Sequence, residues 1–139
     1  MRHIKNWLEH RGKIFSILAV GWVVTVTVLS LAPPSTLPSV SYPHLDKIVH
    51  FIFYYIFLIL WYYALRGEDT FGPVKKKPLL IAFFMAFVYG TIVEVLQYTM
   101  GKGRSGDILD ALANTTGMIC GIFTVILVNA INKTIKRVN

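Results

Sequence analysis

Polar residues with the chemistry of an active or binding site gather in two stretches of this chain, residues 46–54 and residues 94–114. Carboxylates, a histidine and basic side chains can transfer protons, hold anions or bind metal ions. The candidate catalytic residues are His50, Glu94, Asp107 and Asp110. The candidate ligand-binding residues are Asp46, Lys47, Tyr54, Gln97, Lys102, Arg104, Ser105 and Asn114. These residue types fit an enzyme and a binding protein equally well.

The spacing of these polar residues matches one face of an α-helix, which repeats about every 3.6 residues. The sets with this spacing are Asp46, His50 and Tyr54; Glu94, Gln97 and Tyr98; and Asp107, Asp110 and Asn114. We therefore expect each set to form one polar stripe along its helix.

The segments that must position these stripes are far more apolar than those of a soluble protein. Of the 139 residues, 55% are hydrophobic and 15% charged, and the mean hydropathy is +0.57. A soluble domain usually has about 25% charged residues. Four apolar segments, at residues 14–32, 48–65, 79–100 and 108–131, are long enough to cross the roughly 30 Å hydrocarbon core as helices. The sequence predicts one all-α domain over residues 1–139, a four-helix polytopic transmembrane bundle.

The first apolar segment could instead be the core of a cleaved signal peptide. Its 19 uncharged residues exceed the usual core of about 7–15 residues, and Pro33 and Pro34 follow where cleavage would occur. We therefore expect a retained helix. At the end of the second segment, Trp61, Tyr62 and Tyr63 predict an aromatic belt at the membrane interface.

Basic residues flank the apolar segments unevenly and predict the orientation of the bundle. Eleven Lys and Arg residues lie in the two termini and in the loop at residues 66–78, whereas three lie on the other side. Because positive charge stays in the cytoplasm, both termini are expected there, an N-in/C-in topology. The net charge of +7 then reflects topology rather than nucleic-acid binding. The polar stripes consequently fall in the outer half of the membrane.

Glu94 is the acid with the least favourable position, about 9 Å inside the end of its segment at 1.5 Å per residue. A carboxylate near mid-bilayer costs about 2.5–3.5 kcal/mol, so Glu94 must pair, bind a cation, hold a proton or line a wet cavity. A structural salt bridge to Lys47 or Arg104 is the alternative. His50 beside Asp46 could be a general base, a ligand of a divalent metal ion or a hydrogen-bonded interfacial residue. The sequence leaves the cofactor unidentified.

Two groups of glycines stand out, one in the turn between the third and fourth segments and one within the fourth segment. The turn GKGRSGD at residues 101–107 has glycines spaced as in a dinucleotide-binding loop, but it follows an apolar helix rather than a strand. Its backbone amides, with Lys102 and Arg104, would make an anion cradle at the start of the next helix. A tight turn with positive φ angles explains the glycines equally well. Gly117 and Gly121 form a G-x-x-x-G pair, for which we expect close helix packing within the monomer.

Two motifs in the chain, DKIVHFIFYYIF at residues 46–57 and GTIVEVLQYTMGKGRSGDILDALANTTGMICG at residues 90–121, resemble the VanZ-like family of bacterial membrane proteins. The resemblance covers most of the chain and carries over Asp46, Lys47, His50, Phe51, Tyr54, Glu94, Gln97, Arg104, Asp107, Asp110, Asn114, Gly117 and Gly121. It implies a multi-pass protein of the bacterial cell membrane. The protein that names the family lowers susceptibility to teicoplanin, a lipoglycopeptide antibiotic, so the resemblance implies a role in the envelope but no particular reaction.

Three functions are compatible with these features. The first is an outward-facing polar pocket that binds or modifies an envelope component, such as a lipid-linked cell-wall precursor or an anionic envelope polymer. The second is a non-enzymatic membrane scaffold for envelope machinery. The third is an ion- or proton-coupled transporter subunit, which predicts broken helices near mid-membrane and polar residues in both halves of the bundle.

Overall fold

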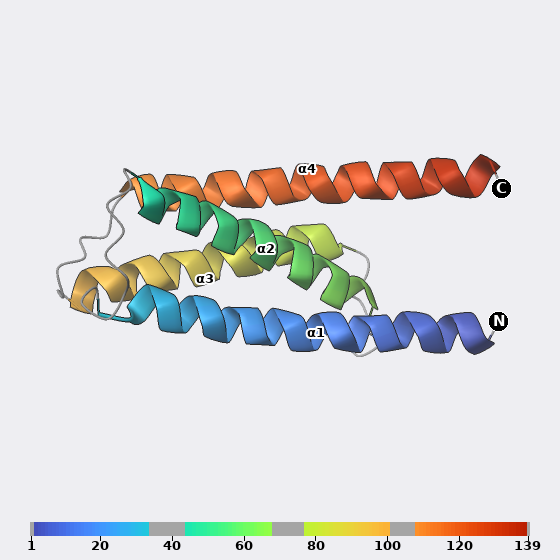
Figure 1. Cartoon of the computed structure of the whole chain (residues 1–139), viewed down its shortest axis with the longest axis horizontal. Coiled ribbons are helices and arrows are strands. Elements are labelled where there is room, and N and C mark those ends of the chain that lie inside the picture. The colour runs from blue at the N-terminus through green and yellow to red at the C-terminus, as the bar shows by residue number, and fades with distance from the viewer. Residues whose placement is uncertain (1, 34–43, 68–76, 101–107, 139) are drawn as a thin grey trace.

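The computed structural model of the chain describes residues 2–33, 44–67, 77–100 and 108–138, with side chains described from residue 11 onward. Within these residues the chain forms four α-helices and no strand. The helices are α1 (Arg2–Leu31), α2 (Leu45–Gly67), α3 (Pro78–Met100) and α4 (Ile108–Val138), and they lie side by side in an elongated bundle (Figure 1). Each is long and apolar enough to cross a membrane, which confirms the predicted all-α transmembrane bundle.

The helix ends agree with the predicted segments for α2 and α3 but not for α1 and α4. The helices α1 and α4 contain 30 and 31 residues, against 23 each for α2 and α3. The predicted segments at residues 14–32 and 108–131 are the apolar spans, and on the side of the chain termini the helices continue beyond these spans into the basic flanks. Lys, Arg and Glu are good helix formers and no proline interrupts either flank, so the helices continue past the apolar segments.

Both chain termini lie at the same end of the bundle, where α1 and α4 extend beyond α2 and α3 (Figure 1). This placement confirms that the termini share one side of the membrane. That this side is cytoplasmic stays a prediction from the distribution of basic residues.

The helix α2 is at the centre of the bundle. It packs most extensively against α4 and α1 and less against α3, whereas α3 and α4 contact each other over a small area. A cluster of buried side chains surrounds its middle turns, with Tyr54, Phe57 and Leu58 from α2, Ala86 from α3 and Met118 from α4. Large apolar side chains cover the outer faces of the helices, as expected for surfaces in contact with lipid.

The predicted close packing of the G-x-x-x-G pair within the monomer is confirmed. A Cβ atom at Gly117 would overlap the carbonyl oxygen of Phe51 on α2. A Cβ atom at Gly121 would lie 2.9 Å from Cδ2 of Leu58 and 3.3 Å from the carbonyl oxygen of Tyr55. The two glycines therefore let the backbones of α2 and α4 approach each other more closely than any side chain would allow.

Hydrogen bonds tie α1 to its neighbours inside the apolar region. The indole Nε1 of Trp22 donates to the carbonyl oxygen of Phe53 at 2.9 Å. The hydroxyl of Tyr89 on α3 donates to the carbonyl oxygen of Val23 at 3.2 Å and lies 2.8 Å from the hydroxyl of Thr27. These bonds satisfy the polar groups of Trp22, Thr27 and Tyr89 inside the apolar region, where no water is available to do so.

The predicted aromatic belt at the end of α2 is wrong for Tyr62. Its side chain is buried against Leu65, Ala82 and Val125 instead of facing the membrane interface. Tyr63 stacks on Phe15 of α1 with ring centroids 5.0 Å apart. Both tyrosines therefore face other helices rather than the membrane interface.

Candidate functional site

The candidate site lies at the end of the bundle opposite the chain termini. Here α2 and α4 begin and α3 ends (Figure 1). His50, Glu94 and Asn114 come from three different helices and meet at this end. The prediction that polar residues of three spans converge at one end is therefore correct for these residues.

The amide of Asn114 connects the imidazole of His50 to the carboxylate of Glu94. Asn114 Nδ2 donates to Glu94 Oε1 at 3.1 Å, and His50 Nδ1 lies 3.0 Å from Asn114 Oδ1. Because Oδ1 can only accept, His50 Nδ1 carries a hydrogen in this arrangement. The same nitrogen lies 3.7 Å from Glu94 Oε1. The lone pair of the neutral ring is then on Nε2.

The glycine contact explains why these side chains meet. Asn114 precedes Gly117 by three residues on α4, and His50 precedes Phe51 on α2. Gly117 lies directly against the Phe51 carbonyl group, so the next turn of α4 is held beside His50. His50 and Asn114 are both buried. The position of the hydrogen-bonded chain His50–Asn114–Glu94 (the polar chain) is thus set by backbone packing rather than by a flexible loop.

A charged cluster lies about one turn further toward the same end of the bundle. Lys47 Nζ is 2.8 Å from Asp110 Oδ1 and donates a hydrogen bond to Asp46 Oδ2 at 2.6 Å. The side chains of Lys47 and Asp110 are 21% and 13% exposed, whereas that of Asp46 is 59% exposed. Lys47 and Asp110 therefore form the less exposed part of the cluster and link α2 to α4. The contact with Asp110 is a charge interaction without hydrogen-bond geometry, since that oxygen accepts no hydrogen bond among the described residues.

Tyr54 lies below the polar chain, one turn deeper than His50. Its ring rests on Gly90 of α3, where an added Cβ atom would be 2.9 Å from Tyr54 Cε1. The ring is almost fully buried, and its hydroxyl has no hydrogen-bond partner among the residues that the structure describes. Since Gly90 precedes Glu94 by one turn, Tyr54 forms the floor of the site.

Comparison with known proteins identifies the family. The sequence model of VanZ/LLP1 matches residues 4–129, a range that includes all of the site residues described above. The chain belongs to the VanZ/LLP1 family. This membership confirms the resemblance inferred from the two motifs. Searches of the curated proteins and of the solved structures return no significant match.

Several predicted site residues of this VanZ/LLP1 chain lie outside the described residues. They are Lys102, Arg104, Ser105 and Asp107. The anion cradle and the Glu94–Arg104 salt bridge therefore stay predictions. A divalent metal site also stays a prediction. Among the described residues no three His, Cys, Asp or Glu side chains come together.

Neither Gln97 nor Tyr98 points in the same direction as Glu94, so the predicted polar stripe on α3 is wrong for both residues. Gln97 is buried and its Nε2 donates to the carbonyl oxygen of Ser30 on α1 at 2.8 Å. Tyr98 is 71% exposed and faces outward. The two side chains are about 100° apart around the helix, and the neighbours of α3 cover too narrow an arc to bury both. Sequence analysis of this VanZ/LLP1 chain missed Ser30, because its backbone oxygen carries no sequence signal.

The bond between Gln97 and Ser30 leads to a first prediction, that Gln97→Met weakens the bundle without affecting the site. Methionine has a similar volume but cannot donate to the Ser30 carbonyl group. We expect a destabilisation of about 1 kcal/mol, typical of one interhelical hydrogen bond in a membrane protein. Thermal unfolding of the purified protein in detergent measures it. Thr91→Val is the control, since Thr91 is exposed and bonds only to its own helix among the described residues. Equal melting temperatures for the two variants would contradict the prediction.

Proposed function

We propose that this VanZ/LLP1 protein binds an anionic component of the bacterial envelope at the end of the bundle formed by His50, Glu94 and Asn114. We further propose that His50 transfers a proton there and that the activity lowers susceptibility to lipoglycopeptide antibiotics such as teicoplanin. The observation that carries the proposal is the linkage of a buried imidazole to a partly buried carboxylate through the Asn114 amide.

The position of Glu94 in the apolar region supports a functional role. A carboxylate near the bilayer centre costs about 2.5–3.5 kcal/mol, and an apolar residue would avoid this cost. Glu94 accepts a hydrogen bond from the Asn114 amide and lies near His50 Nδ1. These contacts favour a hydrogen on Nδ1 of the imidazole. A histidine held in one tautomer by a second group is the usual arrangement for general acid–base catalysis.

The distribution of basic residues indicates which side of the membrane the site faces. If the eleven basic residues at the termini and in the loop at 66–78 are cytoplasmic, the site faces outward. The component would then be a lipid-linked cell-wall precursor or an anionic polymer at the outer leaflet of the cell membrane. Lys47, which is partly exposed, and the predicted cradle residues Lys102 and Arg104 would attract its negative charge.

Glu94→Gln tests this function without removing the packing. Glutamine keeps an oxygen that accepts the hydrogen bond from Asn114 Nδ2, but it removes the negative charge beside His50. We expect a susceptible bacterial host that gains teicoplanin resistance from the wild-type chain to gain none from this variant. General acid–base groups typically contribute about 10²–10⁴-fold to a rate. Protein abundance in the membrane should be unchanged, and Tyr98→Phe on the exposed face should behave as the wild type.

A scaffold without catalytic activity is the second candidate, and one observation favours it. The site residues bond to one another across α2, α3 and α4, as residues of a structural lock would do. A scaffold predicts that Glu94→Gln retains full resistance, because the interhelical bonds persist. That result would exclude the proton-transfer proposal. The transporter alternative predicts broken helices, whereas α1 to α4 are continuous over their described lengths.

A further inference from the structure

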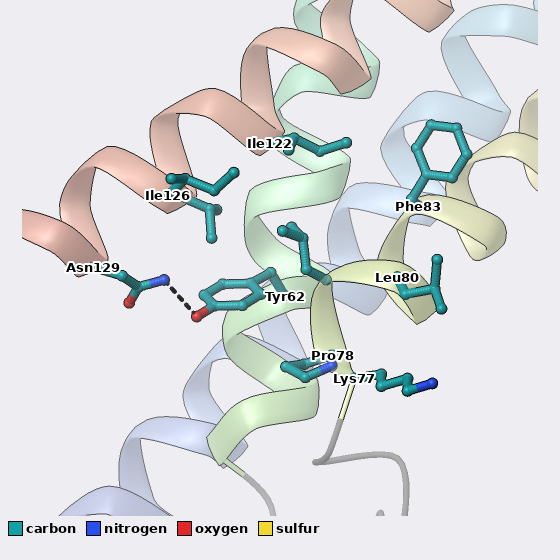
Figure 2. Close-up of a pocket in the computed structure, with 10 residues that line it drawn as sticks. Tyr62, Lys77, Pro78, Leu80, Phe83, Ile122, Ile126 and Asn129 are labelled. Carbon is teal, nitrogen blue, oxygen red and sulfur yellow. Dashed lines mark hydrogen bonds between the residues drawn. The ribbon is translucent and has the colours of Figure 1, made fainter.

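A second concave site lies at the end of the bundle where the chain termini are, far from His50. It is a groove of about 580 Å³ between α2, α3 and α4 (Figure 2). This volume lies in the range of about 300–1,000 Å³ that is usual for small-molecule sites. Leu80 on α3 and Ile126 on α4 stand at its edges and are 48% and 53% exposed. The groove therefore opens sideways, toward the surrounding lipid.

The groove exists because α3 and α4 both pack on α2 without closing on each other. Gly117 and Gly121 bring α4 against α2, whereas α3 and α4 share only a small contact area. Phe83 on α3 and Ile122 on α4 form the facing walls (Figure 2). These walls are apolar, so water is a poor occupant and a hydrocarbon chain is a good one.

Polar groups are confined to the end of the groove nearest the chain termini. Asn129 Nδ2 donates to the Tyr62 hydroxyl at 2.7 Å, as Figure 2 shows. Arg66 Nη1 donates to the same hydroxyl at 2.7 Å and to Asn129 Oδ1 at 2.6 Å. Arg66 is exposed in the last turn of α2, so this network holds its guanidinium at the membrane edge.

A second cation stands at the rim of the groove. Lys77 is exposed and precedes Pro78, the first residue of α3, and Figure 2 shows its side chain extending outward from the rim. Proline at the first position of a helix has the backbone angle that the helix needs. The start of α3 therefore places the backbone of Lys77 at the rim of the groove.

We propose that this groove binds one anionic phospholipid from the adjacent leaflet, with an acyl chain between Phe83 and Ile122 and the phosphate group near Lys77. The apolar walls and the cationic rim match the two parts of such a molecule. A second copy of the chain fits less well, because a specific protein interface buries about 800 Å² on each partner and would extend far beyond the groove. The site uses neither His50 nor Glu94 and does not depend on the function proposed above.

Native mass spectrometry of the purified full-length chain in detergent tests the proposal, with dioleoyl phosphatidylglycerol and dioleoyl phosphatidylcholine as probes. We expect one tightly bound phosphatidylglycerol per chain and weaker binding of phosphatidylcholine. Lys77→Gln should weaken phosphatidylglycerol binding about fivefold, the equivalent of about 1 kcal/mol for one basic residue at a membrane surface. Lys13→Gln, an exposed basic residue on α1, is the matched control and should leave the affinity unchanged.

Filling the groove tests the acyl-chain part of the site. Ile126→Trp and, independently, Leu80→Trp should each weaken binding of both lipids at least tenfold. Ile17→Trp on the exposed face of α1 should have no effect. Measuring the melting temperature of each variant is the control for folding. Equal affinity for the two lipids, equal effects of Lys77→Gln and Lys13→Gln, retained binding in both groove-filling variants, or a dimer that these variants dissociate would each overturn the proposal.

Discussion

Gly117→Ala is expected to destabilise the bundle by about 3 kcal/mol or more, at the upper end of the range for overpacked interiors. The new Cβ atom would overlap the carbonyl oxygen of Phe51, which belongs to the backbone of α2 and cannot rotate away. The helices α2 and α4 must therefore separate. The separation also moves Asn114 away from His50, so the variant should lose resistance as well as stability.

Cys120 provides the measurement for this prediction. It is the single cysteine of the chain, lies in α4 three residues after Gly117 and is only partly exposed. Its reaction with a maleimide during heating in detergent reports the opening of the α2–α4 contact. Gly21→Ala is the matched control, because nothing lies within 4 Å of a Cβ atom there. Alanine is about 1 kcal/mol better than glycine in a helix, so this control should melt at the same or a higher temperature. A similar loss of thermal stability in Gly117→Ala and Gly21→Ala would contradict the close contact between Gly117 and the Phe51 carbonyl group.

Lys47→Met is expected to destabilise the bundle about as much as Gly117→Ala does, but for an electrostatic reason. The variant leaves Asp110, which is only 13% exposed, without the ammonium group 2.8 Å away. Removing one partner of a fully buried ion pair costs about 3–5 kcal/mol, because the remaining charge is uncompensated in a poorly hydrated environment. Both side chains of this pair keep some exposure, so we expect a loss no larger than the lower end of that range. The exposed Asp46 should contribute little, since water solvates it.

A double-mutant cycle separates the ion pair from other roles of Lys47. Replacing both partners, in Lys47→Met with Asp110→Leu, removes the uncompensated charge, and exchange of a buried pair for apolar residues is often close to neutral. We therefore expect the double variant to melt near the wild-type temperature while the single variant melts far below it. The single and the double variant should both lack resistance if Lys47 or Asp110 takes part in ligand binding. Additive losses of stability in the cycle would show that the two residues do not interact.

The helices and the end of the bundle at which the site lies could be predicted from the sequence because these are local properties. Apolar length, the prolines between residues 33 and 43 and the glycines between residues 101 and 106 mark the spans. Consecutive spans must run in opposite directions. His50, Glu94 and Asn114 therefore had to fall at one end of the bundle, whatever the details of packing. The close contact at Gly117 could also be predicted, since a glycine pair four residues apart has few other uses in a membrane helix.

Which side chains meet was decided by the tertiary structure. Spacing along one helix specifies angles about that helix alone, and it does not specify how far the helix is rotated against its neighbours. That rotation placed Asn114 between His50 and Glu94, turned Tyr98 outward and turned Tyr62 into the bundle. It also paired Gln97 with the backbone of α1, a helix without polar residues that mark it as part of the site. The rotation results from the summed packing of all four described helices, and this sum involves contacts between residues far apart in the sequence.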